Sequence, residues 1–196
     1  RNKAELFLTK AALEIKQAND TDAIASLNKV LEFKLNSLQR ARTEFVIGQL
    51  YAKQGDYVKS TLHFKKSISG KANPEMDFYT KLFIAQNAAK GGGDKQFATN
   101  QLDKIIKDPK YDKYKSKAYN VLASIYAEDN PEKAIDILHK SIKGMDNKDP
   151  LEKATAYALL GQLYYAKSDY EEAKVSYDSA SHFGTNPALE NINEVN

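Results

Sequence analysis

The sequence contains the stretch LLGQLYYAKSDYEEAKVSYDSA at residues 159–180 and a near copy, VIGQLYAKQGDYVKSTLHFKKS, at residues 46–67. Both stretches read Gly-Gln-Leu-Tyr, then Asp-Tyr, and then place an aromatic residue, Phe64 or Tyr177, at the same spacing. A helix-turn-helix pattern that returns so far along the chain indicates that one structural unit is repeated.

Small residues recur between and around these two copies at a period of about 37 residues, which is typical of helical repeats. They are Ala12, Gly48, Ala85, Ala123 and Gly161. A second series has a small residue at i, a large one at i+4 and a third residue at i+7, which share one helix face. Its members are Ala23, Ser60, Ala98, Ala134 and Ala173, then Leu27, Phe64, Leu102, Leu138 and Tyr177, then Val30, Ser67, Ile105, Ser141 and Ala180.

This pattern predicts close helix packing, because two antiparallel helices approach closely only where one side chain is small. One helix pair cannot bury its apolar face, whereas a stack of pairs can. We therefore expect an all-α protein with one helical repeat domain over residues 1–183 and a polar C-terminal tail over 184–196. Helices are expected near 3–18 and 21–34, 37–54 and 57–69, 74–90 and 95–107, 113–128 and 131–143, and 150–167 and 169–183. The five pairs then span 3–34, 37–69, 74–107, 113–143 and 150–183.

Capping residues support these boundaries. Asn73, Asn130 and Asp149 each precede a proline that suits the first position of a helix. Ser168 and Glu171 have the spacing of a capping box. The run of three glycines at 91–93 predicts the end of one helix, with Asp94 as the cap of the next.

These motifs resemble the tetratricopeptide repeat family, which implies a right-handed solenoid. The carriers are Leu-Gly-Gln-Leu-Tyr at 160–164, Asp-Tyr-Glu-Glu-Ala at 169–173, and then Tyr177, Ala180 and Pro187. The second repeat matches through Gly48, Tyr51, Gly55, Tyr57, Phe64 and Pro74. The first and third repeats are degenerate, and the period is longer than the usual ~34 residues.

Four longer phrases resemble the SprE/PorW-type lipoproteins of Bacteroidota, which serve type IX secretion and gliding motility. They are ARTEFVIGQLYAKQGDY from Ala41, NPEMDFYTKLFIAQ from Asn73, KIIKDPKYDKYKSKAYNVLASIY from Lys104 and KATAYALLGQLYYAKSDYEEAKVSYDSA from Lys153. The resemblance implies a periplasmic scaffold held at the outer membrane by a lipid anchor outside this segment, with other secretion-machine components as partners. A cytoplasmic adaptor of another pathway is the alternative.

The start at Arg1, without an initiator methionine or signal peptide, predicts that the sequence is a piece of a larger protein or a mature form. The chain has no cysteine, and its net charge of +3 calls for neither a nucleic acid nor an anionic membrane as partner.

Catalytic chemistry is not predicted. The three histidines fall on second helices of different repeats and are expected to be partly exposed, not metal ligands. The glycines at 91–93 lack the spacing of a phosphate-binding loop. We therefore expect no enzyme activity, no cofactor and no metal.

The basic stretch 104–117, with Tyr111 and Tyr114, could contact nucleic acid. Interspersed aspartates instead favour a solvated corner with its tyrosines packed beneath it.

Protein recognition is the predicted function. In tetratricopeptide solenoids the first helix of each pair lines the concave face. Counting from the small residues predicts a partner-binding set that mixes amides, cations and two tyrosines. It comprises Arg42, Gln49, Lys53, Tyr79, Gln86, Lys90, Lys117, Asn120, Ser124, Gln162 and Tyr165. The alternatives are a wet groove without a ligand, a groove filled by the tail, and binding through edges or other faces.

Overall fold

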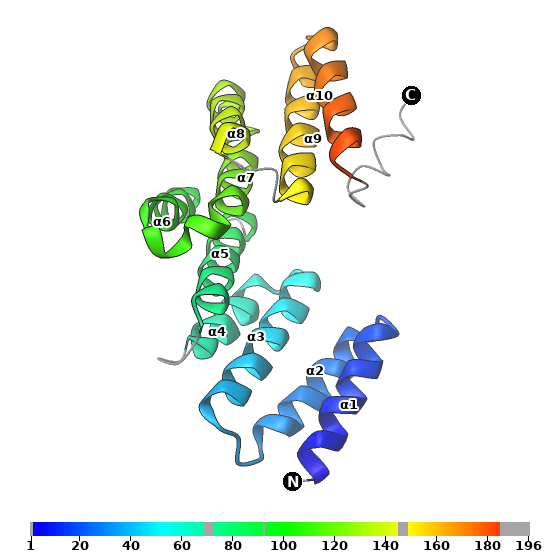
Figure 1. Ribbon diagram of the computed structural model, residues 1–196. Coiled ribbons are helices and arrows are strands. Elements are labelled where there is room, and N and C mark those ends of the chain that lie inside the picture. The colour runs from blue at the N-terminus through cyan, green and yellow to red at the C-terminus, as the bar shows by residue number, and fades with distance from the viewer. Residues whose placement is uncertain (1, 69–72, 92, 145–148, 185–196) are drawn as a thin grey trace. The chain divides into compact units, whose positions relative to one another are not determined.

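A computed structural model describes residues 2–68, 73–91, 93–144 and 149–184 (Figure 1). In this part of the chain the secondary structure is helical throughout, without strands. The helices are α1 (Asn2–Lys16), α2 (Asp20–Leu31), α3 (Ser37–Lys53), α4 (Tyr57–Ser67), α5 (Pro74–Lys90), α6 (Lys95–Lys107), a 3₁₀ helix η1 (Pro109–Tyr114), α7 (Lys115–Tyr126), α8 (Pro131–Gly144), α9 (Pro150–Ala166) and α10 (Tyr170–Phe183).

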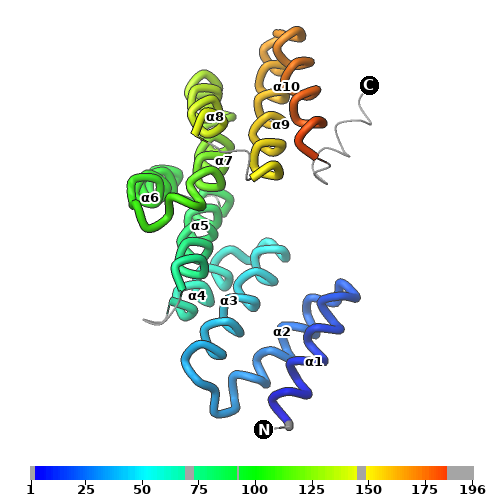
Figure 2. Tube along the Cα trace, in the orientation of Figure 1, coloured from blue at the N-terminus to red at the C-terminus, as the bar shows by residue number. Residues whose placement is uncertain are grey.

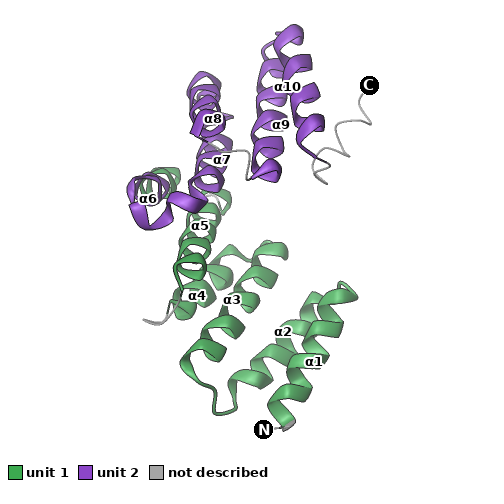
Figure 3. Ribbon diagram, viewed as in Figure 1, with its two compact units in different colours: residues 1–101 green, residues 102–196 purple. Residues whose placement is uncertain are grey.

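The chain divides into two compact units, Arg1–Gln101 and Leu102–Asn196 (Figure 3). In the first unit α1 packs on α2, α2 on α3, α3 on α4 and α4 on α5. In the second unit α7 packs on α8, and α9 contacts α7, α8 and α10. The chain trace shows α1 beside α2 and α9 beside α10 as helix pairs (Figure 2). No shift of composition marks the division between the units, and it falls within α6.

The predicted helices are confirmed, with ends that differ by at most three residues and with both ends of α5 and α6 as expected. The exception is the segment before α7, where a helix was expected from residue 113. Instead Asp108 accepts a hydrogen bond from the backbone N–H of Lys110 at 2.9 Å, and Pro109 starts the 3₁₀ helix. The predicted helix end at residue 69, the middle glycine at 92 and the tail from 185 lie outside the described residues.

The predicted packing positions form the core. All the small residues, large residues and third residues of the second helices are buried, except that Tyr177 is half-buried. Among the first helices, Gly48, Ala85, Ala123 and Gly161 are buried as expected, but Ala12 is exposed and Ala11 is buried in its place. The prediction of Ala12 is wrong by one residue, because the degenerate first repeat has no Gly-Gln-Leu-Tyr motif to set its register.

Two glycines show why the small positions are needed. A Cβ atom at Gly48 would lie 2.9 Å from the ring of Phe64, and one at Gly161 would lie 2.5 Å from the ring of Tyr177. Both distances are shorter than van der Waals contact, so each aromatic ring rests directly on the backbone of the facing helix. The two copies of the opening motif therefore build the same contact, α3 on α4 and α9 on α10.

The helix starts use the predicted caps, with one correction. Side-chain oxygens of Asn73, Asp94 and Asn130 accept backbone N–H groups at 2.8, 2.8 and 3.0 Å, and that of Asp149 does so more weakly at 3.4 Å. The capping box predicted for Ser168 is wrong, since Asp169 caps α10. Ser168 instead occupies the left-handed region at φ 61°.

The same turn recurs between the helices of three pairs. Ala18, Gly55 and Ser168 have φ values of 57°, 78° and 61°, and each precedes the residue that caps the second helix. Glycine adopts this conformation freely, whereas alanine and serine adopt it at a cost.

Across the described helices, none is both long enough and apolar enough to span a bilayer.

Candidate partner-binding surfaces

Most of the predicted partner-binding residues lie on the surface, but one does not. Exposed members are Arg42, Gln49, Lys53, Lys90, Ser124, Gln162 and Tyr165, and partly buried members are Tyr79, Gln86 and Lys117. Asn120 is only 4% exposed, so the expectation that it is an exposed contact residue is wrong. The binding role of the others stays a prediction.

Asn120 is the centre of a buried polar joint in the second unit. Its Nδ2 donates to the backbone oxygen of Glu152 at 3.1 Å and to Glu152 Oε2 at 3.0 Å, while its Oδ1 accepts from Ser141 at 3.3 Å. Lys117 pairs with the other carboxylate oxygen of Glu152. These bonds join α7, α8 and α9, so Asn120 and Lys117 have a structural role that their spacing alone did not reveal.

Other predicted residues contact side chains within their own unit. Lys53, on α3, forms an ion pair with Asp20 of α2 at 2.7 Å. Tyr79 lies 6.1 Å from Phe83 between ring centroids, in a stacked arrangement. Tyr165 is exposed and meets Tyr170 edge to face at 5.5 Å, which leaves aromatic surface open on the second unit.

The histidines lie on α4, α8 and α10 as expected. His139 and His182 are exposed, but the side chain of His63 is only 12% exposed. His63 Nδ1 lies 2.6 Å from Glu44 Oε2, and its ring stacks on Tyr51 at 5.4 Å. His63 is thus partly exposed, as expected, although less so than the other two histidines, and it joins α3 to α4. Among the described residues, no three histidine, aspartate or glutamate side chains are grouped to hold a metal ion.

The basic stretch 104–117 forms the predicted corner. Tyr111 is buried and Tyr114 is partly buried, beneath Lys110 and Lys113, whose Nζ atoms lie 5.2 and 5.8 Å from the respective ring centroids. Lys115 also pairs with Asp112. Lys110, Lys113 and Lys115 are thus engaged with side chains of this corner. A nucleic acid would need such cations for contacts with its phosphates.

Burial raises the pKa of two repeat tyrosines, Tyr164 and Tyr177, because their ionised forms lose hydration. At Tyr164 the nearby carboxylates of Glu172 and Asp169 act in the same direction. Both side chains face neighbouring helices, as core packing predicts.

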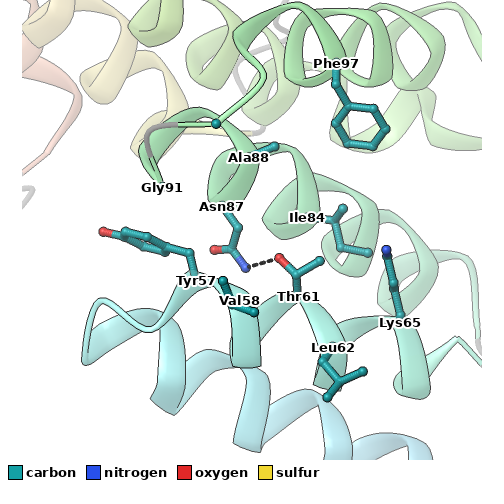
Figure 4. A pocket seen from close by; sticks show the side chains of 11 residues that line it. Tyr57, Val58, Thr61, Leu62, Lys65, Ile84, Asn87, Ala88, Gly91 and Phe97 are labelled. Carbon is teal, nitrogen blue, oxygen red and sulfur yellow. Dashed lines mark hydrogen bonds between the residues drawn. The ribbon is translucent and has the colours of Figure 1, made fainter.

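An open groove in the first unit was not predicted. It has a volume of about 500 Å³ and is lined by α4, α5, Gly91, Gly93 and the start of α6 (Figure 4). Val58 and Leu62 of α4 and Phe97 of α6 are 83, 50 and 40% exposed. Periodicity could not reveal it, because a row of exposed apolar residues on α4 reads in the sequence as core.

Solved structures with the same fold come from proteins of low sequence identity. MamA from Desulfovibrio magneticus RS-1 is 17% identical, with a TM-score of 0.62 over 93% of this chain and 96% of its own. BtubC from P. vanneervenii is 16% identical, with a TM-score of 0.61 over 95% of this chain and 80% of its own. YrrB, a tetratricopeptide repeat protein with an unusual peptide-binding site, is 18% identical, with a TM-score of 0.53 over 90% of this chain and 84% of its own.

No protein-family model matches the sequence, and no curated protein does. The structural likeness shows a tetratricopeptide-type fold, all-α and built from helix pairs.

Proposed function

We propose that this chain is a non-enzymatic scaffold that binds other proteins. The observation that carries the proposal is the apolar and aromatic surface that the helix pairs leave open. Val58 and Leu62 are exposed in the first unit, and Tyr165 and Tyr170 are exposed in the second. Aromatic and aliphatic side chains held on rigid helices are typical anchors of protein interfaces. The fold is shared with YrrB, a peptide-binding repeat protein.

A more specific role is proposed from the four phrases that resemble the SprE/PorW-type lipoproteins. We infer a periplasmic component of the type IX secretion and gliding machinery, associated with the outer membrane and linking ring and translocon components. An adaptor in another pathway would use the same surfaces.

Cross-linking in living cells tests both levels of the proposal. A photo-reactive residue at Tyr165 and another at Gln49, two exposed positions, should each yield discrete protein adducts. Adducts with outer-membrane or periplasmic secretion components would support the specific role, whereas adducts with cytoplasmic proteins would contradict it. Cross-links to no protein at either position would contradict the scaffold itself.

A further inference from the structure

The groove between α4 and α6 has an apolar wall on each side. Val58 and Leu62 project from α4, Phe97 projects from α6, and Ile84 of α5 lies between them (Figure 4). Three of these side chains keep 40% or more of their surface in water. Single exposed apolar residues are common on proteins, but a contiguous hollow group of them marks a binding surface.

Gly91 and Gly93 line one end of the groove. A Cβ atom at Gly93 would lie 2.6 Å from the backbone oxygen of Ala88, and one at Gly91 would lie 3.2 Å from that of Asn87. The chain therefore passes directly over the end of α5, where a side chain at position 93 has no room. The glycines that end α5 thus also shape the groove.

The side-chain amide of Asn87, in the groove, has hydrogen-bond partners among the described residues for its nitrogen only. Asn87 is only 5% exposed, and its Nδ2 donates to Ser60 at 2.7 Å and to Thr61 at 3.1 Å. Its Oδ1 accepts no hydrogen bond from the part of the chain that the structure describes. Buried side-chain amides normally have partners for both ends. An N–H group of a bound polypeptide would supply such a donor.

The described lining of the groove carries positive charge only. Lys65 is the single charged residue among the described residues that line it, and none of those residues is a carboxylate. Lys65 forms no ion pair with a described residue, and Lys66 follows it in the last turn of α4. An occupant with a carboxylate would therefore be favoured at this end.

We propose that this groove binds a short segment of a partner protein that carries two apolar side chains beside an acidic residue. The apolar side chains would lie between Leu62 and Phe97, a backbone N–H would donate to Asn87 Oδ1, and the carboxylate would pair with Lys65. This inference rests on the proposed scaffold function and names one of its binding surfaces, formed by α4, α5 and the start of α6.

A peptide library tests the inference while the partner is still unidentified. Random twelve-residue peptides displayed on phage are selected on the immobilised full chain. Selected peptides should carry paired apolar residues next to Asp or Glu. Leu62→Asp should weaken their binding about tenfold or more, because it places a charge where the apolar side chains dock. Lys65→Glu should weaken acidic peptides about fivefold and favour the same peptides with Lys in place of the acidic residue.

Matched controls lie on α10, which does not line the groove. Val175 and Lys174 are exposed there, so Val175→Asp and Lys174→Glu should leave peptide affinity unchanged. Circular dichroism of every variant shows whether it folds, and the exposure of Leu62 and Lys65 predicts that each does.

Several outcomes would overturn the inference. They are the failure to select any peptide, selected peptides that bind Leu62→Asp as tightly as the native chain, and a lack of acidic residues among them. Equal loss of peptide binding in the α10 control variants would also refute it. A concentration-dependent dimer abolished by Leu62→Asp would assign the groove to a second copy instead. In-cell cross-links at Tyr165 and Gln49 report on the scaffold function separately, so that function can stand where the groove proposal fails.

Discussion

At the scale of single residues, the two glycines under aromatic rings are the positions where the sequence and the structure agree most closely. Gly48 and Gly161 are identifiable from spacing alone. The aromatic rings that contact them, Phe64 and Tyr177, are also at the positions that the spacing predicts. Spacing could identify them because a backbone contact of this kind admits only one residue type.

Gly161→Leu is predicted to lower the free energy of unfolding by about 3 kcal/mol, since its side chain would occupy the space of the Tyr177 ring. Thermal and urea unfolding measure the change. Gly144→Ala is the control, because nothing lies within 4 Å of a Cβ atom there. Equal stability of Gly161→Leu and the native chain would contradict the contact.

Ala18→Gly is predicted to raise the free energy of unfolding by about 0.5 kcal/mol. The left-handed conformation at φ 57° costs alanine about 1 kcal/mol or more, and glycine removes this cost. The greater conformational freedom of glycine in the unfolded chain offsets part of the stabilisation. Ala127→Gly makes the same replacement at φ −53° and should instead lower stability by about 1 kcal/mol. Urea titrations of both variants should therefore shift in opposite directions; a shift in the same direction would show that backbone strain at Ala18 is negligible.

At the scale of helices, periodicity predicted the packing of α1 on α2, α3 on α4, α7 on α8 and α9 on α10, but not which polar groups join the pairs. The small and large positions fall on a regular period, so their burial follows from the sequence. Asn120 and Glu152 meet across 32 positions of the chain, and no spacing rule connects them. The 3₁₀ helix was missed for a related reason, since Asp108 and Pro109 redirect the backbone locally before α7 begins.

Glu152→Gln and Glu132→Gln compare the contributions of two ion pairs to stability. Glu152 of α9 pairs with Lys117, and Glu132 pairs with Lys167 at the end of α9. Glu152 is buried and contacts Asn120 and Lys117, so Glu152→Gln is predicted to lower the free energy of unfolding by about 2 kcal/mol. Glu132 is exposed, and a hydrogen bond from Lys167 lowers its pKa. Water screens that pair, so Glu132→Gln should leave the melting temperature unchanged. Equal effects of the two variants in parallel melts would show that burial does not distinguish the pairs.

The contact of α9 with α10 is predicted to weaken at alkaline pH. Burial raises the pKa of Tyr177 above its ordinary value of about 10, so the neutral phenol is favoured in the folded state. Its contribution is complete below pH 10 and is lost as the pH rises through the higher folded pKa. Melting temperatures measured from pH 7 to 11 should fall less steeply for Tyr177→Phe than for the native chain. Tyr170→Phe, at an exposed position, should keep the native slope.

At the scale of the whole molecule, the fold class was predictable and the binding surface largely was not. Repetition of one motif is enough to indicate stacked helix pairs. The groove instead depends on how far α6 lies from α4 and on which side chains this spacing leaves uncovered, among them Val58 and Phe97. A helix pattern reports an apolar face but does not report whether another helix covers it.

Destabilisation of one pair is predicted to remain local, because within each unit the helices pack mainly on their neighbours. In Gly161→Leu, hydrogen exchange of α9 and α10 should accelerate, while exchange of α1 and α2 should keep its native rate. Mass spectrometry of peptic peptides resolves both regions. Acceleration throughout the chain would indicate a single cooperative unit instead.

The buried joint of Asn120, Lys117, Ser141 and Glu152 bears on how such a protein can evolve or be re-engineered. Duplication and recombination readily add repeats when every junction is apolar and interchangeable. Here Glu152 of the fifth pair is received by Asn120 and Lys117 of the fourth, while α5 meets α4 through Asn87, Ser60 and Thr61. If the repeats were rearranged, the carboxylate of Glu152 would be buried without Asn120 and Lys117. Re-engineering of the chain therefore has to keep the fourth and fifth pairs adjacent.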